Sequence, residues 1–209
     1  MNNGWKLAGM LLGSMLLAGM LLTSTATMGV AGGSAHADAR PTAPSGPPVP
    51  GPKANFFEDS DGSIYYEIRN LRTQGCADVQ HHSHTPGANV RQYDCEGNQA
   101  NQLWRLEPAA GTNYYALRNR ESLQCLDIES TNPVPPNGTV VEQKPCNIFA
   151  QNQRWEFRFI GTAGIVTHNL VSRAGGKCLD LDDGSFGNDK RIQVWNCEAG
   201  NNNQLWYLN

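Results

Sequence analysis

The sequence predicts an all-β fold in which three copies of one unit close into a pseudo-threefold barrel. Three Gln-x-Trp motifs recur at a constant step, because Trp104, Trp155 and Trp206 lie 51 residues apart both times. A cysteine precedes the Gln of every motif by seven residues, at positions 95, 146 and 197. A register kept three times indicates internal repetition. A unit of about 50 residues cannot bury an apolar face alone, whereas three units can share one core.

Each unit is expected to hold four short strands, separated by the Gly, Asn, Asp and Pro residues that favour turns. No stretch of the chain after residue 37 keeps the 3.6-residue apolar period of a helix, so helix content should be small. The predicted strands are 64–70, 76–80, 89–95 and 102–106 in the first unit, 114–119, 124–128, 139–143 and 154–159 in the second, and 165–171, 177–181, 191–195 and 204–208 in the third.

The N-terminal 56 residues are expected to lie outside the barrel. Residues 1–37 have the features of a secretory signal peptide: Lys6, an uncharged and mostly apolar run over 7–22, and the small-residue cleavage site Ala35-His36-Ala37. An uncleaved membrane anchor is the alternative, since no formal charge lies between Lys6 and Asp38. Residues 38–56 read as a proline-rich, semi-rigid linker. The domain itself is expected to span 57–209.

The six cysteines predict three disulfides and an oxidising compartment. Six cysteines allow fifteen pairings, but the repeat selects one, which is 76 with 95, 125 with 146, and 178 with 197. None of these pairs has the short spacing of a zinc site. We therefore expect a secreted, extracellular protein with no metal ligands among its cysteines.

Charge and motifs exclude several functions. After residue 37 the chain has 15 basic and 19 acidic residues, a net charge of 15 − 19 = −4, with no basic run, so nucleic acid is not an expected partner. No nucleophile elbow, zinc-protease motif or phosphate-binding glycine loop is present. A loop with His81, His82 and His84 could collect a metal ion, but the other units have no counterpart and a solvated loop is favoured. We expect no cofactor and no enzymatic activity.

The motif tryptophans are predicted to fill the shared core. The Gln residues before them either bond buried backbone or reach a ligand at the rim. Tyr66, Tyr115 and His168 each lie ten residues before the first cysteine of their unit. His168 is therefore interpreted as a packed strand residue and not as a catalytic one.

The three Cys-x-Asp, Cys and Gln-x-Trp units resemble the ricin-type β-trefoil lectins, also called QxW carbohydrate-binding modules. The resemblance covers roughly residues 60–209. It implies a β-trefoil of three four-stranded repeats, with up to three shallow sugar sites and no chemistry of its own.

In that family the sugar is held by the Asp after the first cysteine, a polar residue four before the second, an aromatic two before it, and the Asn-Gln of the motif. The third repeat matches throughout, which implies a site made of Asp180, Gln193, Trp195, Asn203 and Gln204. The first repeat supplies Asp78, Tyr93, Asn101 and Gln102, with Arg91 at the amide position. The second repeat has Asp127, Asn152 and Gln153, but Glu142 replaces the amide and Lys144 the aromatic. The resemblance therefore ranks the third site first and the second site last.

The same residues fit a sugar on physical grounds. An ionised Asp can accept from two adjacent hydroxyls, and Trp195 can stack on the C–H face of a pyranose, for which galactose is well suited. Trp195 is the one tryptophan after residue 37 that lies outside a Gln-x-Trp motif, and strand alternation places it on the same face as Gln193. The alternative is that the three aspartates are ordinary turn residues.

We expect a monomeric lectin that binds a galactose- or xylose-type saccharide on a glycan or polysaccharide, and that meets the membrane only through its signal sequence before cleavage. The main alternative is a trefoil interaction or inhibitor protein that binds a protein partner through its loops. The proline-rich insertion at 133–136 and the lost aromatic of the second repeat favour that alternative. A minimal glycosidase is a third alternative, but the sequence does not show two carboxylates facing one another.

Overall fold

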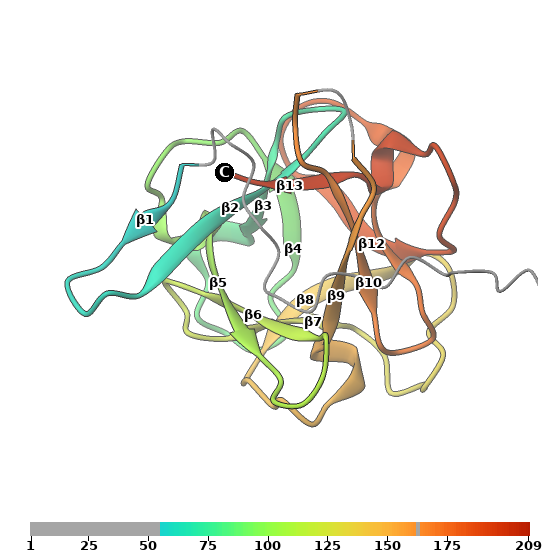
Figure 1. Ribbon diagram of the computed structural model, residues 1–209, viewed down its shortest axis with the longest axis horizontal. Coiled ribbons are helices and arrows are strands. Elements are labelled where there is room, and N and C mark those ends of the chain that lie inside the picture. The colour runs from blue at the N-terminus through green and yellow to red at the C-terminus, as the bar shows by residue number, and fades with distance from the viewer. Residues whose placement is uncertain (1–54, 162–163) are drawn as a thin grey trace, which may run out of the picture. The chain divides into compact units, whose positions relative to one another are not determined.

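The computed structural model describes residues 55–161 and 164–209, and these form the all-β unit of Figure 1. The expected signal peptide and nearly all of the expected linker lie outside the described residues. Within these ranges no helix is long and apolar enough to cross a membrane. The strands are β1 (Phe57–Glu58), β2 (Ile64–Asn70), β3 (Cys76–Val79), β4 (Val90–Tyr93), β5 (Leu103–Pro108), β6 (Tyr115–Asn119), β7 (Cys125–Ile128), β8 (Thr139–Lys144), β9 (Trp155–Phe159), β10 (His168–Ser172), β11 (Cys178–Leu181), β12 (Lys190–Trp195) and β13 (Trp206–Leu208).

Six of these strands close into a barrel. Strand β2 pairs with β5, β5 with β6, β6 with β9, β9 with β10, β10 with β13, and β13 with β2 again, all antiparallel. The ring takes the first and the fourth strand of every repeat. Closure leaves these six strands without a free edge.

The other two strands of each repeat form a hairpin, namely β3–β4, β7–β8 and β11–β12. The three hairpins pair with one another, through β12 with β4 and with β8 and through a bridge between Asn89 and Glu142. A six-stranded barrel capped by three hairpins is the β-trefoil, so the predicted fold class is confirmed.

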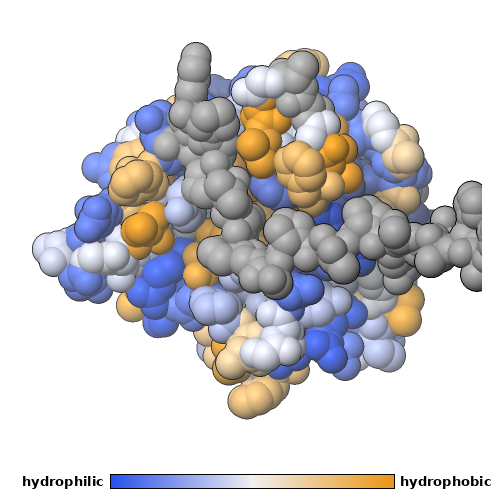
Figure 2. All heavy atoms as spheres, viewed as in Figure 1, coloured by the Kyte–Doolittle hydropathy of each residue, from blue (hydrophilic) through white to orange (hydrophobic). Residues whose placement is uncertain are grey.

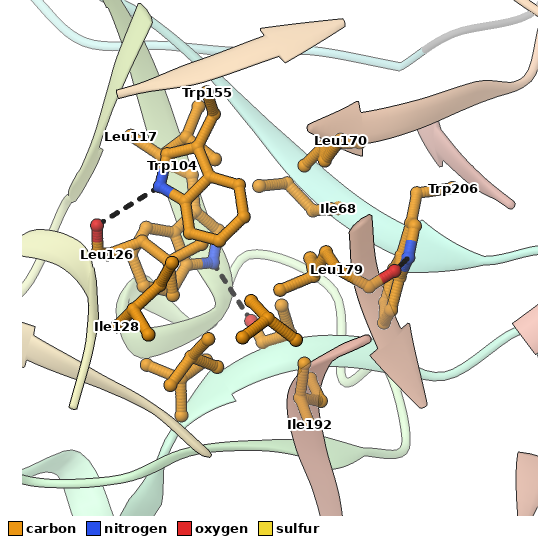
Figure 3. Close-up of a cluster of buried hydrophobic side chains, with 14 of the residues drawn as sticks. Ile68, Trp104, Leu117, Leu126, Ile128, Trp155, Leu170, Leu179, Ile192 and Trp206 are labelled. Atoms are coloured by element: carbon orange, nitrogen blue, oxygen red, sulfur yellow. Dashed lines mark hydrogen bonds between the residues drawn. The ribbon is translucent and has the colours of Figure 1, made fainter. Parts of the chain in front are cut away.

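Three tryptophans fill the core at equivalent positions, as Figure 3 shows. Trp104, Trp155 and Trp206 are fully buried, and their indole Nε1 atoms donate to the carbonyl oxygens of Ala77, Leu126 and Leu179 at 2.9, 3.2 and 3.0 Å. Each acceptor directly follows the first cysteine of its repeat. A buried indole needs a hydrogen-bond partner, so every motif tryptophan also ties the barrel to its own hairpin.

The three predicted disulfides are confirmed: Cys76–Cys95, Cys125–Cys146 and Cys178–Cys197. In all three pairs the first cysteine is buried at the start of a hairpin strand, while the second is at least partly exposed. The bridges therefore fasten the loop after each hairpin to the body of the trefoil.

The predicted strands match those of the structure within a few residues, with two informative differences. The sequence does not predict the short first strand β1, which pairs with the start of β2 through two residue pairs. Strand β13 begins at Trp206 and not at 204, because 202–204 form the 3₁₀ helix η5 (Asn202–Gln204). The helices η2 (Ala100–Gln102) and η3 (Gln151–Gln153) stand at the same place in the other repeats. These turns direct the motif Gln residues into the protein.

On the face seen in Figure 2, hydrophilic side chains cover most of the described surface and apolar ones form separate groups. Among the described residues, the most exposed large apolar side chains are Phe149 (79%) and Phe186 (65%). Both lie in loops.

Candidate functional site: three hairpin pockets

Each hairpin carries one buried aspartate at the same place. Asp78, Asp127 and Asp180 lie in β3, β7 and β11 and are 6%, 1% and 4% exposed. Their direct partners across the hairpin are Arg91, Glu142 and Gln193. The aspartates are thus strand residues, and the interpretation of them as turn residues is wrong.

In the third repeat two side-chain amides hold the carboxylate. Gln193 Nε2 donates to Asp180 Oδ1 and Gln204 Nε2 to Oδ2, both at 3.0 Å. Burial raises the pKa of Asp180, and the two amide hydrogen bonds act against that rise. Each carboxylate oxygen has two lone pairs, so an oxygen bonded to one amide can still accept from a ligand.

Asp180 and Gln193 line a shallow pocket of about 160 Å³. Trp195 forms one side of it and is partly buried, so its indole is within reach of a ligand. Four of the five expected residues line this pocket, together with Asp182, Asp183 and Asn201. Arg191 pairs with Asp182 at 3.2 Å and also donates to Gln193 Oε1 at 2.5 Å. Arg191 therefore holds the side-chain amide of Gln193 in the orientation in which it donates to Asp180.

The fifth expected residue, Gln204, does not line the pocket. Its side chain is fully buried: Nε2 donates to Asp180 and to Asn196 O (2.9 Å), and Oε1 accepts from Glu198 N (2.9 Å). Gln102 is buried in the same way in the first repeat and donates to Asp78 Oδ2 at 2.8 Å. The expectation that these glutamines contact the sugar directly is therefore corrected. Their side-chain amides hydrogen-bond within the protein and position the carboxylate of the aspartate.

The first repeat has the larger pocket, about 420 Å³. Asn101 Nδ2 and Gln102 Nε2 both donate to Oδ2 of Asp78, at 2.9 and 2.8 Å. Within the described ranges, Oδ1 of Asp78 has no hydrogen-bond partner. Tyr93, which is 38% exposed, lines the same pocket with Asp78 and Asn101. This pocket offers an unused carboxylate oxygen beside an exposed aromatic ring, although the resemblance ranked it second.

Charged groups surround the first pocket. Burial raises the pKa of Asp78 to about 6, against the lowering effect of the Gln102 hydrogen bond and of His82. A hydrogen bond to Glu121 raises the pKa of His82, so this ring carries positive charge more readily than a free imidazole. Arg91 lines the pocket, and no described residue forms a hydrogen bond or an ion pair with its side chain.

In the second repeat, charged side chains occupy the position where a sugar would bind. Lys144 takes the place of the aromatic, and its ammonium pairs with Glu142 and lies 4.0 Å from Asp127 Oδ1. Asn152 and Gln153 donate to the two oxygens of Asp127 at 2.8 and 2.7 Å. At the position where the other repeats have an aromatic ring, the described part of the second repeat therefore offers a sugar no ring to stack on. A neighbouring pocket of about 410 Å³ is lined by a different set, Ser130, Thr131, Asn132, Pro133, Gln151, Asn152 and Ala174.

Sequence reasoning missed the pocket residues that come from another repeat or from the loop after the aspartate. Asp189 lines the first pocket but belongs to the third repeat, and Gln80 Nε2 donates to it at 2.9 Å. A pattern within one repeat contains no signal for such a residue. Asp182 lies two places after Asp180, and strand alternation could have placed it on the same face.

His82 and His84 lie in the segment after β3, whereas His168 lies in β10. His82 and His84 face Glu121 at 2.9 and 3.7 Å. Among the described residues, three possible metal-ligand atoms come together at Glu67, Cys76 and Cys95, and both of these cysteines are in a disulfide. His168 is buried in β10 against the ring edges of Phe157 and Phe159, and burial lowers its pKa to about 4.

Comparisons with known proteins agree with the trefoil fold. The designed threefold-symmetric protein ThreeFoil is 33% identical and superposes with a TM-score of 0.62 over 69% of this chain and 96% of its own. The exo-β-1,3-galactanase 1,3Gal43A from Clostridium thermocellum is 27% identical with a TM-score of 0.61, over 71% of this chain but only 32% of the enzyme. A Polyporus squamosus lectin, solved with the epitope Neu5Aca2-6Galb1-4GlcNAc, is 18% identical with a TM-score of 0.58, over 69% of this chain and 48% of that one.

A search of curated proteins returned no match. The family model of the ricin-type β-trefoil lectin domain matches residues 64–206 of this chain. This range includes the three pocket aspartates, all six cysteines and all three Gln-x-Trp motifs. The chain belongs to the ricin-type β-trefoil lectin domain family, and this membership supports carbohydrate binding.

Proposed function

We propose that the chain is a secreted, non-catalytic lectin that binds galactose- or xylose-type saccharides in the pockets of the first and third repeats. One observation carries the proposal. In each of these pockets a buried carboxylate lies beside an accessible aromatic ring, Asp78 with Tyr93 and Asp180 with Trp195. The second repeat lacks the ring and is not expected to bind.

The pairing suits a pyranose, which has hydroxyls around its rim and an apolar C–H face. A charged hydrogen bond from a hydroxyl to the carboxylate contributes about 1.5–3 kcal/mol, and stacking on the ring removes apolar area from water. The axial hydroxyl of galactose lies on one face of the ring and leaves the opposite C–H face continuously apolar. The likeness to a galactanase, at 27% identity over a third of that enzyme, supports a galactose-type ligand.

Each pocket alone should bind weakly, because both are open and shallow. We expect a Kd of about 1 mM for a monosaccharide, or about −4 kcal/mol. Two sites on one rigid trefoil raise the apparent affinity for a polymer when their spacing fits it. The three disulfides support an extracellular location, where such polymers are met.

A glycan array with matched variants tests the proposal. Trp195→Ala and Tyr93→Ala should each weaken binding, and the double variant should abolish it, while circular dichroism and thermal unfolding stay close to those of the wild type. Phe149→Ala is the control, because this exposed ring lines none of the three pockets described above. Unchanged array binding by the folded double variant would refute the two-site assignment.

A separate assay tests the proposal that the protein does not hydrolyse the saccharide it binds. Incubation with β-1,3-galactan and with xylan should release no reducing ends. Release by the wild type that is lost in Asp78→Asn would assign a hydrolase to the first pocket instead.

A second candidate function, capture of a protein partner, is favoured only at the second repeat. There the ion pair of Lys144 and Glu142 closes the sugar position, and Leu123, Ile148 and Phe149 are exposed at 55%, 40% and 79%. This function would be favoured if the wild type bound no sugar on the glycan array but bound a protein ligand, and if Phe149→Ala abolished the protein binding.

A further inference from the structure

One loop lies between the two proposed sugar pockets. It starts with the 3₁₀ helix η4 (Asp182–Gly184) and runs to the beginning of β12. Asp182 and Asp183 line the pocket of the third repeat, and Asp189 lines that of the first. The loop spans 189 − 183 = 6 residue steps between these walls, so they lie at most about 22 Å apart. One extended saccharide could therefore reach from one pocket to the other.

The tip of this loop is held rigidly. Gln92, 1% exposed in β4, donates from Nε2 to the carbonyl oxygens of Ser185 (3.2 Å) and Gly187 (3.1 Å). These two carbonyls flank Phe186, a residue that is 65% exposed. An anchor on both sides fixes the backbone at the position that presents the ring to solvent.

The Phe186 ring is connected to the third pocket through Arg72 and Gly184. The guanidinium carbon of Arg72 lies over the ring, 6.0 Å from its centroid, and Arg72 Nε donates to Gly184 O at 3.1 Å. Gly184 lies against the pocket residue Asn203, since a Cβ at this glycine would come within 2.2 Å of Asn203 Oδ1. The two terminal amino groups of Arg72 form no hydrogen bond with any described residue, so they are free to donate to a ligand.

We propose that Phe186 is an intermediate stacking site for a polysaccharide that passes from the third pocket to the first. This inference rests on the proposed lectin function and narrows its ligand to an internal segment of a polymer, as opposed to a terminal sugar. The C–H face of a pyranose packs on the exposed ring, and Arg72 donates to the hydroxyls of the same unit. The anchored backbone reduces the ordering entropy that a mobile loop would lose on binding.

A single exposed phenylalanine is common on protein surfaces and carries no function by itself. Phe186 differs from Phe149, the more exposed ring, in three respects: its flanking carbonyls are bonded to a buried glutamine, a cation covers part of the ring, and its loop borders two pockets. Phe149 is therefore a matched control.

The test compares a monosaccharide with its polymer, using galactose with β-1,3-galactan and, in parallel, xylose with xylan. Affinities are measured by isothermal titration for the sugars and by affinity electrophoresis for the polymers. Phe186→Ala should weaken polymer binding about fivefold, the amount expected for one lost stacking contact, and leave monosaccharide binding within twofold. Phe186→Trp should restore polymer binding, and Phe149→Ala should match the wild type on both.

The possible failures are distinguishable. If Phe186→Ala binds the polymer as tightly as the wild type, the intermediate site is refuted while the pockets stand. If monosaccharide binding falls equally, Phe186 acts on a pocket and the bridging role is wrong. If the wild type binds none of the four probes, the lectin proposal fails and the stacking site fails with it.

Discussion

The ammonium of Lys144 pairs with the carboxylate of Glu142 at the place where Trp195 and Gln193 stand in the third repeat. Glu142 is 4% exposed and Asp127 only 1%, so two carboxylates are buried side by side under one lysine. The Glu142 pair raises the pKa of Lys144, and burial raises that of Asp127. The second repeat thus has an ion pair between a half-exposed lysine and a buried glutamate where the third repeat has an aromatic ring and an amide.

Restoring the platform should restore a site. Glu142→Gln together with Lys144→Trp, placed in a protein that lacks Tyr93 and Trp195, is expected to recover binding with a Kd of about 1 mM, since the Asp127 cradle is intact. The measurement is a titration with the monosaccharide that the wild type binds, followed by tryptophan fluorescence.

The single substitution Lys144→Trp serves as the control. It leaves the carboxylate of Glu142 without its cation, which should lower the free energy of unfolding, so this variant should unfold at a lower temperature. A folded double substitution that stays silent in the titration would mean that more than two side chains separate the second repeat from the others.

Sugar binding in the first pocket should depend on pH near 6. Burial raises the pKa of Asp78 to about 6, and the neutral carboxyl is a poorer acceptor than the carboxylate. In Trp195→Ala, where the first pocket acts alone, affinity should fall about tenfold from pH 7.5 to pH 5, following the ionised fraction. Isothermal titration at several pH values measures it.

The same group predicts an opposite trend in stability. Because the folded pKa lies above the ordinary value of 3.8, the folded state binds the proton more tightly, and the contribution of Asp78 to the free energy of unfolding rises as pH falls from about 6 to about 4. Asp78→Asn should remove this contribution. His82→Gln should keep the binding inflection near pH 6, and its loss there would assign the titration to the imidazole.

The fold could be predicted because the same cysteine and tryptophan pattern occurs in each of the three repeats. The spacing of Trp104, Trp155 and Trp206 predicted three equivalent core positions, and the cysteines predicted three bridges. These features depend on residues close in sequence. Repetition then made chance agreement improbable.

The pockets could be predicted only in part, because they form between repeats. Asp189 reaches the first pocket through the pairing of β12 with β4, and that pairing leaves no mark within a single unit. Gln204 was expected at the rim, but the 3₁₀ turn before β13 directs it inward, toward Asp180. The sequence also does not show which polar atoms lack a hydrogen-bond partner within the protein. In the first pocket both amides donate to Oδ2 of Asp78 and leave Oδ1 for a ligand, and this depends on how the side chains are arranged in space.

Removing one disulfide should lower stability without changing the fold. The bridges close loops of 19, 21 and 19 residues, and in the chain-entropy model each contributes about 3 kcal/mol. The paired change Cys178→Ala and Cys197→Ala should lower the free energy of unfolding by that amount in urea. An equal midpoint for this variant and the oxidised wild type would show that packing alone holds the third hairpin.

Two buried glutamines should hold two equivalent loops. Gln143 donates to the carbonyl oxygens of Ser83 (2.7 Å) and Thr85 (3.1 Å), as Gln92 does to those of Ser185 and Gly187. Substitution of either glutamine by Leu removes the donor from two carbonyls and should cost about 1–3 kcal/mol of stability. Hydrogen exchange followed by mass spectrometry should separate the two variants. Gln92→Leu should speed exchange in 183–189 and leave 81–87 protected, and Gln143→Leu should do the reverse. Exchange that rises in both loops in either variant would mean that the three hairpins loosen as one unit, in which case Phe186 would not be held independently of the rest.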